Sequence, residues 1–300
     1  MWVVKYRKIW FSISTVIIIF SIWSIFNYGF NLSIDFKGGT LTEVYFSETR
    51  PEKSKLEEQI MLVNVGGFSL RPSGDNAFVI RTKELNELEK KNINDILISE
   101  FSGKIERQNT VGPIAGNELK SKATKAVAVV ILMIVLFITF AFRKVSKPVS
   151  SWKYGLATII ALSHDVIIPT GIFAFLGMFI GIEIDLLFVT GLLAILGYSV
   201  HDTIVVFDRV RENLKYNQEK DIKESFETTV GRSVSQTFTR SINTSVTIFI
   251  TLIALYVFGS IATKNFSLLL LIGVVAGTYS SIFIASPLLI TFYKWQKSSS

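Results

Sequence analysis

The stretch Gly197–Asn213, GYSVHDTIVVFDRVREN, places an acidic residue inside an otherwise apolar run. That residue is Asp202, because Leu186–Gly197 before it and Ile204–Phe207 after it are almost entirely apolar. A helix through these residues would hold the Asp202 carboxylate within the hydrocarbon of a membrane, where ionisable groups are costly and usually functional. The rest of the chain must therefore supply the surroundings that such a carboxylate needs.

Composition points to a membrane protein. Apolar residues make up 49% of the 300 residues, and the mean hydropathy is +0.45. The chain has no cysteine and only two histidines, which argues against a disulfide framework, a thiol nucleophile and the usual zinc site. Its formal charge of +7 is sorted by segment, as membrane topology requires, so nucleic acid is not an expected partner.

Apolar segments long enough to cross a membrane as helices occur six times. They lie at about 9–29, 123–142, 154–179, 186–207, 242–260 and 267–293. The first follows a basic segment, 1–8, but it is too long for a signal peptide and Asn27–Phe30 offers no small-residue cleavage site, so we interpret it as an uncleaved anchor.

Basic residues indicate the orientation of these helices. The termini and the connections on one side carry sixteen Lys and Arg residues, whereas the short loops of the other side carry one. By the positive-inside rule both termini, the loop 208–241 and the tail 294–300 are cytoplasmic. The sequence thus predicts a multi-pass membrane protein with residues 30–122 exported, outside the inner membrane if the source is Gram-negative.

The exported segment has the character of a small soluble domain, since its 13 basic and 14 acidic residues nearly cancel. Apolar periodicity predicts the order β-α-β-β-α-β, a ferredoxin-like α+β fold. The expected strands are 41–46, 69–71, 77–82 and 104–111, and the expected helices are 52–65 and 84–101. A domain of this size suits a contact surface better than a substrate cavity.

Asp35, Gly38 and Gly39 form a turn motif, Asp-Phe-Lys-Gly-Gly, at the beginning of this domain. The two glycines permit positive φ or close backbone approach. A phosphate-binding loop is not supported, because the sequence has neither a Walker lysine pattern nor a dinucleotide fingerprint and no helix directly follows.

A second acidic residue, Asp165, lies in the third apolar segment next to His164. At about 1.5 Å per residue it is roughly 16 Å from the start of the segment, close to the middle of the bilayer. Pro169 has no N–H to donate to the Asp165 carbonyl, so this oxygen needs another donor, which favours a water molecule near Asp165. The alternative is a helix kink whose two polar residues are satisfied by neighbouring helices.

Arg240, at the cytoplasmic end of the fifth segment, is the cation that we expect Asp202 to need. The Ser and Thr residues of Ser235–Ser245 could line a wet path beside it. Structural alternatives are an Asp202 ion pair that only locks helices, and an Arg240 placed by topology alone. His201 points about 100° away from Asp202, and either histidine could be no more than an interhelical hydrogen-bonding group.

Three further features predict architecture. The charges at 208–212 read as a cytoplasmic continuation of the fourth helix, and 215–226 reads as an amphipathic helix on the membrane face. Gly273 and Gly277, with Ser280 and Ser281, would let the last helix pack closely.

Taken together, the motifs resemble the SecD/SecF family of the bacterial protein-export machinery, which belongs to the RND superfamily. The resemblance covers about residues 9–287 and rests on the order of six motifs, of which the long one after Gly197 is the most specific. These motifs are Asp35–Gly39, Val111–Pro113, Ser163–Asp165, Gly197–Asn213, Arg240–Ser245 and Gly277–Ser281.

The resemblance implies a six-helix half-transporter that pairs with SecD, assists the SecYEG channel, with YajC as a further partner, and moves preproteins with the proton-motive force. It implies that Asp202 is the proton-responsive carboxylate and that Arg240 is its partner. It also implies that Asp165, a recurrent acidic position of less defined role, takes part in proton coupling. The family commonly has asparagine where this chain has His201, so protonation of His201 could modulate the Asp202 response. His164 is a second possible modulator.

Alternatives remain open from the sequence. One is a proton-driven small-molecule exporter of the same superfamily, although a single insert of this size is small for a porter domain. Another is a structural scaffold for a SecD-like partner. An enzymatic function has little support, since no nucleophile, base and orienting group occur together outside the membrane. No cofactor is expected, and protons are the expected coupling ion, with sodium left open.

Overall fold

The computed structural model describes residues 2–47, 49–63, 65–142 and 149–298 and divides into two compact units. Unit 1, the membrane bundle, comprises Met1–Asn31, Ala126–Ile182 and Leu187–Ser300. Unit 2, the small domain, comprises Leu32–Lys125 and Glu183–Leu186. The basic residues 143, 144 and 147, which contribute to the predicted orientation, lie outside the described residues.

Long apolar helices confirm the six predicted spans within the described part of the chain. They are α2 (Arg7–Tyr28), α6 (Pro113–Ala141), α7 (Ser151–Phe179), α8 (Leu186–Glu219), α9 (Phe226–Phe258) and a last span at Thr263–Gln296. The last span runs through α10 (Ile261–Ser280), the π-helix η2 (Ser281–Ala285) and α11 (Ser286–Ser298), and a short α1 (Trp2–Lys5) precedes α2.

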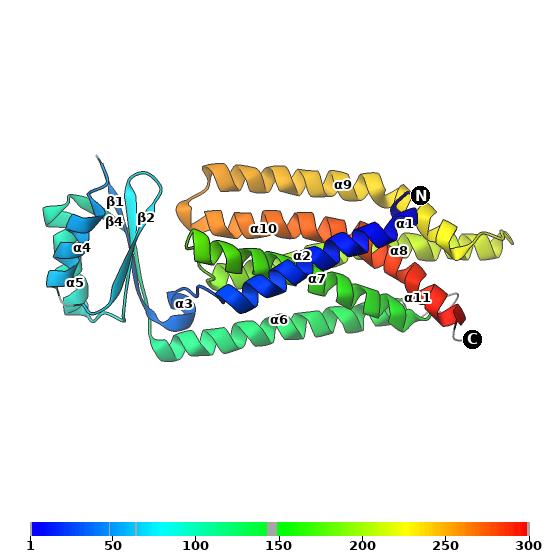
Figure 1. Cartoon of the computed structure of the whole chain (residues 1–300), viewed down its shortest axis with the longest axis horizontal. Helices are drawn as coiled ribbons and strands as arrows, with labels where there is room; N and C mark the ends of the chain where they lie inside the picture. The colour runs from blue at the N-terminus through cyan, green and yellow to red at the C-terminus, as the bar shows by residue number, and fades with distance from the viewer. Residues whose placement is uncertain (1, 48, 64, 143–148, 299–300) are drawn as a thin grey trace. The chain divides into compact units, whose positions relative to one another are not determined.

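The two termini lie at the same end of the bundle (Figure 1). Glu227, in the first turn of α9, joins them there. Its carboxylate is 2.6 Å from the Arg7 guanidinium and 2.7 Å from the Lys294 ammonium. The distribution of basic residues likewise predicts that both termini lie on the same side of the membrane.

Residues 208–241 are mostly helical. The expected continuation of the fourth helix through 208–212 is confirmed, whereas the sequence suggested a loop for most of the remainder. Helix α8 continues to Glu219, and α9 begins at Phe226 after a turn at 220–225. The amphipathic helix predicted at 215–226 was therefore wrong. The helix persists beyond the apolar segment because ion pairs three or four residues apart support it, as between Asp208 and Arg211 at 2.5 Å.

Close approaches between helices occur where a small residue faces a neighbour. A Cβ on Gly171 of α7 would lie 2.4 Å from the Cα of Ser21 in α2. A Cβ on Gly273 of α10 would lie 2.2 Å from the Ile195 side chain of α8, which is the close packing expected for the last span. Larger residues would separate these helices.

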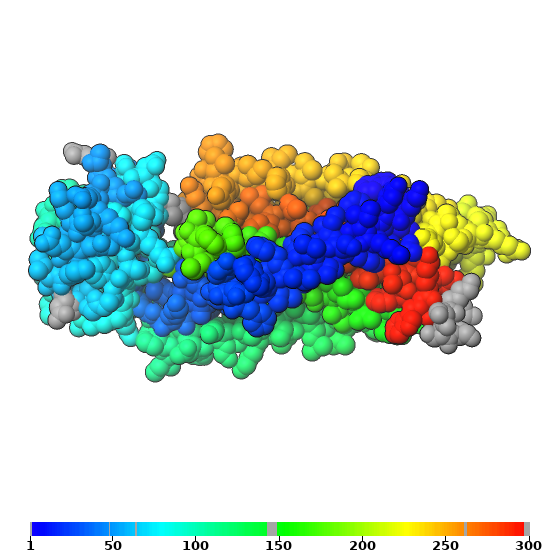
Figure 2. All heavy atoms as spheres, in the orientation of Figure 1, coloured from blue at the N-terminus to red at the C-terminus, as the bar shows by residue number. Residues whose placement is uncertain are grey.

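The outer surface of the bundle is apolar, as a lipid-facing surface must be. Figure 2 shows α2, in blue, on the face turned to the viewer. Its side chains Val16 and Phe26 are 66% and 83% exposed, and Phe140 of α6 is 60% exposed. The buried core lies inside and includes an aromatic group of Phe142, Tyr154 and Phe207.

The small domain has the predicted ferredoxin-like order of elements. Its antiparallel sheet has the strand order β2-β3-β1-β4, and its helices pack on one face (Figure 1). The strands are β1 (Gly39–Phe46), β2 (Phe68–Ser73), β3 (Ala77–Thr82) and β4 (Gly103–Val111), and the helices are α4 (Lys53–Leu62), α5 (Glu87–Asp95) and the π-helix η1 (Ile96–Glu100). Buried residues of both layers, such as Phe46, Ile60 and Leu97, form the core.

A one-turn helix, α3 (Ile34–Lys37), leads into this sheet and ends in the two glycines of the turn motif. Gly38 and Gly39 adopt φ values of 78° and 130°. A Cβ on Gly39 would lie 2.5 Å from the Thr82 carbonyl oxygen, and one on Gly38 would lie 2.8 Å from Pro113 Cα. Only glycine therefore allows the chain to turn between β3 and the start of α6.

Candidate functional site

Asp202 lies in α8 with only 7% of its surface exposed. One carboxylate oxygen, Oδ1, accepts a hydrogen bond of 2.6 Å from the hydroxyl of Ser241 on α9. The other, Oδ2, is buried and has no hydrogen-bond partner among the described residues. A buried carboxylate oxygen without a donor is costly, and it is free to take up a proton.

Arg240, the partner expected from sequence, forms no ion pair with Asp202 within 4.0 Å in the described structure. It acts on the Asp202 charge through space, as His201 does, and both of these side chains are exposed. Arg240 lines a hollow of about 480 Å³ together with the charged residues Asp208, Arg209 and Glu212. The direct contact belongs to Ser241, the next residue along α9.

Asp165 is fully buried in α7 and has a complete set of partners. Its Oδ2 accepts hydrogen bonds from the hydroxyls of Ser199 on α8 and of Ser280 on α10, the latter at 2.7 Å. Its Oδ1 lies 2.9 Å from Nδ1 of His164. The carboxylate therefore joins α7, α8 and α10 at one point, and Ser280 has a polar role beyond the close packing expected for it.

His164 is 2% exposed, and its ring stacks on Tyr279 at a centroid distance of 5.8 Å. Its Nε2 atom is buried without a partner among the described residues.

Pro169 is buried within α7, and Gly197 of α8 has nothing within 4 Å of the place where a Cβ would be. His164 thus belongs to the Asp165 cluster, and Gly197 does not contact either carboxylate.

Hydroxyl groups continue from both carboxylates. Ser281 donates to the Ser199 carbonyl and shares a hydrogen bond of 2.8 Å with Thr203, which follows Asp202. On the Asp202 side, Ser245 donates to the Ser241 carbonyl and is linked to Tyr198 at 2.6 Å. These serines and threonines come from three helices, so the polar interior of the bundle connects α8, α9 and η2.

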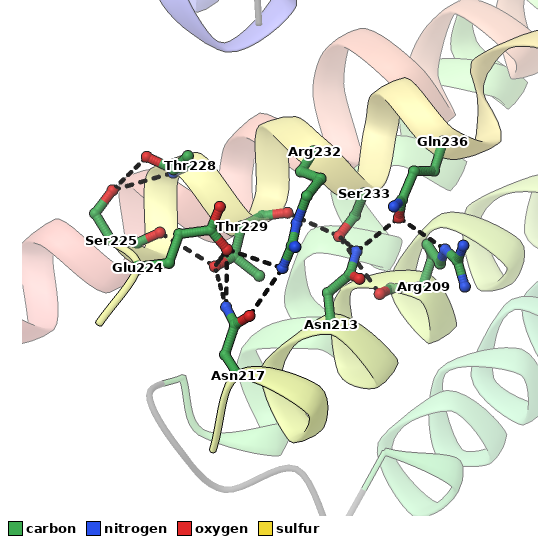
Figure 3. Close-up of polar contacts among 10 residues, drawn as sticks. All are labelled: Arg209, Asn213, Asn217, Glu224, Ser225, Thr228, Thr229, Arg232, Ser233 and Gln236. Atoms are coloured by element: carbon green, nitrogen blue, oxygen red, sulfur yellow. Dashed lines mark hydrogen bonds and ion pairs between the residues drawn. The ribbon is translucent and has the colours of Figure 1, made fainter. Parts of the chain in front are cut away.

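The helical extensions of α8 and α9 beyond the apolar core are joined by a row of polar side chains. Figure 3 shows them reaching across between the two helices. Asn213 donates to Ser233 at 2.8 Å and to Gln236 at 2.9 Å. Asn217 donates to Glu224 at 2.8 Å and accepts from Arg232 at 2.9 Å. We call this pair of extensions, Arg209–Glu219 and Phe226–Gln236, the α8–α9 hairpin.

Sequence reasoning did not identify the donors Ser199 and Ser280 or the two hairpin asparagines as functional. A serine in a membrane helix is common, and its role is visible only when the fold brings it to a carboxylate from another helix. A signal for the hairpin exists, because Asn213 and Asn217 are four residues apart and so lie on one face of α8.

The family model described as "Protein export membrane protein SecD/SecF, C-terminal" matches residues 92–295. A second one, "SecD/SecF GG Motif", matches residues 23–49, which contain Asp35 and the two turn glycines.

Curated relatives carry the name "Protein translocase subunit SecF". The protein from Thermobaculum terrenum is 43% identical, with 97% of this chain and 93% of the relative aligned. That from Sebaldella termitidis is 36% identical, with 98% and 92% aligned.

Two solved structures share the fold over nearly the whole chain. The crystal structure of SecDF, described as a translocon-associated membrane protein from Thermus thermophilus, matches 98% of the chain with a TM-score of 0.82 and 29% identity. A super-membrane-facing form of SecDF matches 99% with a TM-score of 0.66 and 28% identity. The chain spans 38% and 39% of the lengths of these SecDF chains. It belongs to the SecD/SecF family of protein-export membrane proteins.

Proposed function

We propose that the chain is the SecF-type half of a proton-driven assistant of protein export, and that Asp202 is the group that binds and releases the proton. The observation that carries this proposal is the difference between the two buried carboxylates. Asp165 has three partners, whereas Asp202 has one donor and an unpartnered oxygen. A fully hydrogen-bonded carboxylate is stabilised in its charged form, and an incompletely bonded one gains most from a proton.

Asp165 then has a different task from the one that the resemblance suggested by position alone. Its partners on α8 and α10 hold three helices together, so we assign it to the architecture of the bundle. His164 supports it through the 2.9 Å contact to Oδ1. Experiments can distinguish the two acids, because loss of a structural carboxylate lowers folding stability, whereas loss of a proton carrier lowers gradient-driven export.

Protonation of Asp202 would change the α8–α9 contact. A charged Asp202 accepts from Ser241 and is attracted by Arg240 at longer range, and a neutral Asp202 loses the attraction. One elementary charge crossing 100 mV is worth about 2.3 kcal/mol, enough to shift a two-state equilibrium of helix positions substantially. The proton-motive force would thus act through helix packing, without a covalent reaction or a cofactor.

The partners follow from the relatives. SecDF chains contain a segment similar to this chain within a longer polypeptide, which supports pairing with a SecD subunit. We propose the SecYEG channel, YajC and the preprotein as further partners, on the resemblance alone. The shared end of the two termini and the basic residues near it support an inner-membrane protein with both termini in the cytoplasm.

The test is preprotein export into inverted inner-membrane vesicles that contain SecD and either the wild-type chain or Asp202→Asn. We expect the variant to lose the part of export that depends on the proton gradient while it remains in the membrane at wild-type level. Asp208→Asn, which removes an exposed carboxylate six residues (about 1.7 turns) further along α8, is the matched control.

Export that depends on the gradient equally in Asp202→Asn and wild type would refute the role of Asp202. It would favour a scaffold function. Replacing the proton gradient by a sodium gradient in the same vesicles distinguishes the coupling ions, and we expect only the proton gradient to drive export. If Asp202→Asn lost the export of a small apolar dye while its preprotein export stayed intact, the exporter alternative would be favoured.

A further inference from the structure

The short connection between α7 and α8 belongs to the exported domain rather than to the bundle. Residues Glu183–Leu186 group with unit 2. Ile184 forms an isolated bridge with Leu32, and its carbonyl accepts from the Ser33 amide at 2.9 Å. Sequence reasoning used this connection only as a loop without basic residues. It is instead a part of the domain that leads directly into the helix that carries Asp202.

Within this connection, Glu183 pairs with two arginines of the sheet. Its side chain is 10% exposed, and its Oε2 is 2.7 Å from Nη2 of Arg81 on β3. Its Oε1 is 3.8 Å from the Arg71 guanidinium on β2. In the β2–β3 register Arg71 pairs with Val79, two residues from Arg81, so both arginines lie on one face of the sheet.

That face is opposite to the one that the domain helices cover. The neighbouring strand residues Leu70 and Ile80 point into the core with α4 and α5, and their successors Arg71 and Arg81 point away from it. The Arg81 atoms Nε and Nη1 are buried and have no other partner among the described residues. Glu183 is therefore the ion-pair partner that justifies the burial of Arg81.

Asp35 makes the second contact. Its Oδ2 accepts a hydrogen bond of 3.0 Å from the amide of Leu186, which is the first residue of α8. The first amides of a helix have no partner within the helix, and a carboxylate there also interacts favourably with the helix dipole. The turn motif of the exported domain thus caps the helix of the proposed proton site.

We propose that Glu183 and Asp35 are positioning residues that fasten the exported domain to the first turn of α8, so that movement of this helix is transmitted to the domain. The proposal rests on the proposed function of Asp202. Helix α8 is continuous from Leu186 through Asp202, a separation of about 24 Å at 1.5 Å per residue. A continuous helix held at its first residue passes an axial shift or rotation to whatever holds it.

The ion pair is tested by charge reversal. Glu183→Lys faces Arg81 and Arg71 with a like charge, and Arg81→Glu faces Glu183 in the same way, so each single variant should detach the connection. The double variant restores opposite charges and should restore the attachment. Lys53→Glu, which disrupts the exposed pair of Lys53 with Glu57 at 3.4 Å on α4, is the matched control in the same domain.

Two readouts are needed, both on the full chain with SecD in membranes. Hydrogen exchange of the first turn of α8 measures attachment, and gradient-driven preprotein export measures transmission. We expect Glu183→Lys, Arg81→Glu and Asp35→Ala to increase exchange at Leu186–Leu187 at least tenfold and to reduce export at least fivefold. The charge-reversed double variant should recover both, and Lys53→Glu should change neither.

Increased exchange with unchanged export would overturn the inference, because attachment would then be dispensable for transmission. Unchanged exchange in Glu183→Lys and Asp35→Ala would overturn it as well. Failure of the double variant to recover export, with exchange recovered, would show that the charges act elsewhere. The proposed function fails separately, through unchanged export in Asp202→Asn, which leaves the contacts of Glu183 and Asp35 intact.

Discussion

Ser241 donates a 2.6 Å hydrogen bond to Asp202, and through it α9 contacts the carboxylate of α8. The neighbouring Arg240 does not make this contact and points toward a polar hollow. The hydroxyl thus orients the carboxylate, while the arginine supplies charge at a longer range. Hydrogen bonds to charged groups contribute about 1.5–3 kcal/mol, so this single donor matters for the α8–α9 contact.

Ser241→Ala should therefore reduce gradient-driven export several-fold without loss of protein from the membrane, because Asp202 loses its direct donor. Ser241→Thr keeps the hydroxyl and should retain most of the activity. The control is Thr247→Ala on the same helix, whose exposed hydroxyl bonds only to the Asn243 carbonyl. Equal export rates in Ser241→Ala and Thr247→Ala would show that the hydrogen bond is incidental.

Asp165→Ala should destabilise the bundle by about 3–5 kcal/mol, because it leaves the hydroxyls of Ser199 and Ser280 and the His164 ring without their buried partner. The thermal unfolding midpoint of the purified chain in detergent measures this effect. Asp202→Asn, which removes a carboxylate with one donor, should lower the midpoint much less. A variant Asp165→Asn that unfolds like wild type but no longer responds to the gradient would make Asp165 a second proton site.

Asn217→Ala should loosen the α8–α9 hairpin, since it removes the amide that donates to Glu224 and accepts from Arg232, two residues that also pair directly at 2.9 Å. Loss of such a buried hydrogen-bonding partner costs about 1–3 kcal/mol, which corresponds to roughly 5- to 150-fold faster local opening. Hydrogen exchange of residues 210–235 measures it, and Lys215→Ala on the exposed face is the control. Equal exchange in the two variants would mean that apolar packing alone closes the hairpin.

The attachment of the small domain to α8 should depend on pH through Glu183. Burial raises the pKa of this carboxyl above its usual 4.5, ahead of the lowering by Arg81, Arg71 and Lys37 and a small further rise from Asp185. The attached state therefore binds a proton more tightly than a detached state with a solvated Glu183. Attachment should therefore be strongest below pH 4.5, the usual pKa of the group. It should weaken as pH rises through the raised pKa of Glu183.

Hydrogen exchange at Leu186–Leu187, measured from pH 4.5 to pH 8 and corrected for the intrinsic rates, checks this dependence. Glu183→Gln keeps the shape and one acceptor for Arg81, so it should stay attached and lose the pH dependence. A pH profile in Glu183→Gln that matches wild type would place the titrating group elsewhere.

Much of the fold was predictable because the chain alternates between two clear periodicities. Long apolar runs gave the six spans, and short alternating runs gave the β-α-β-β-α-β domain, with β3 at Ala77–Thr82 as expected. The ends of α8 and α9 were less predictable. The continuation of α8 through 208–212 was expected and is confirmed, but the polar residues after it can form either a solvated loop or an ion-paired helix, and apolar periodicity does not distinguish the two.

The candidate site was predictable only in part. Asp202 and Asp165 stand out because a carboxylate in an apolar run is rare, and the fold then places both at buried positions in the bundle. Their partners Ser241, Ser199 and Ser280 do not stand out, since hydroxyls are ordinary in membrane helices. The role of Glu183 as an ion-pair partner could not be predicted for a related reason. Its importance depends on two strand arginines that are about 100 residues away in sequence.

Asp202 itself should change protonation when the proton gradient drives export, and infrared difference spectroscopy of its carboxyl group measures this change. The spectra would be recorded on the chain with SecD in bilayers as pH is stepped. We predict a carboxylic C=O band that appears on acidification, that is absent in Asp202→Asn and that persists in Asp165→Asn. A band that is unchanged in Asp202→Asn, or that disappears only in Asp165→Asn, would contradict the assignment of Asp202 as the proton-binding group.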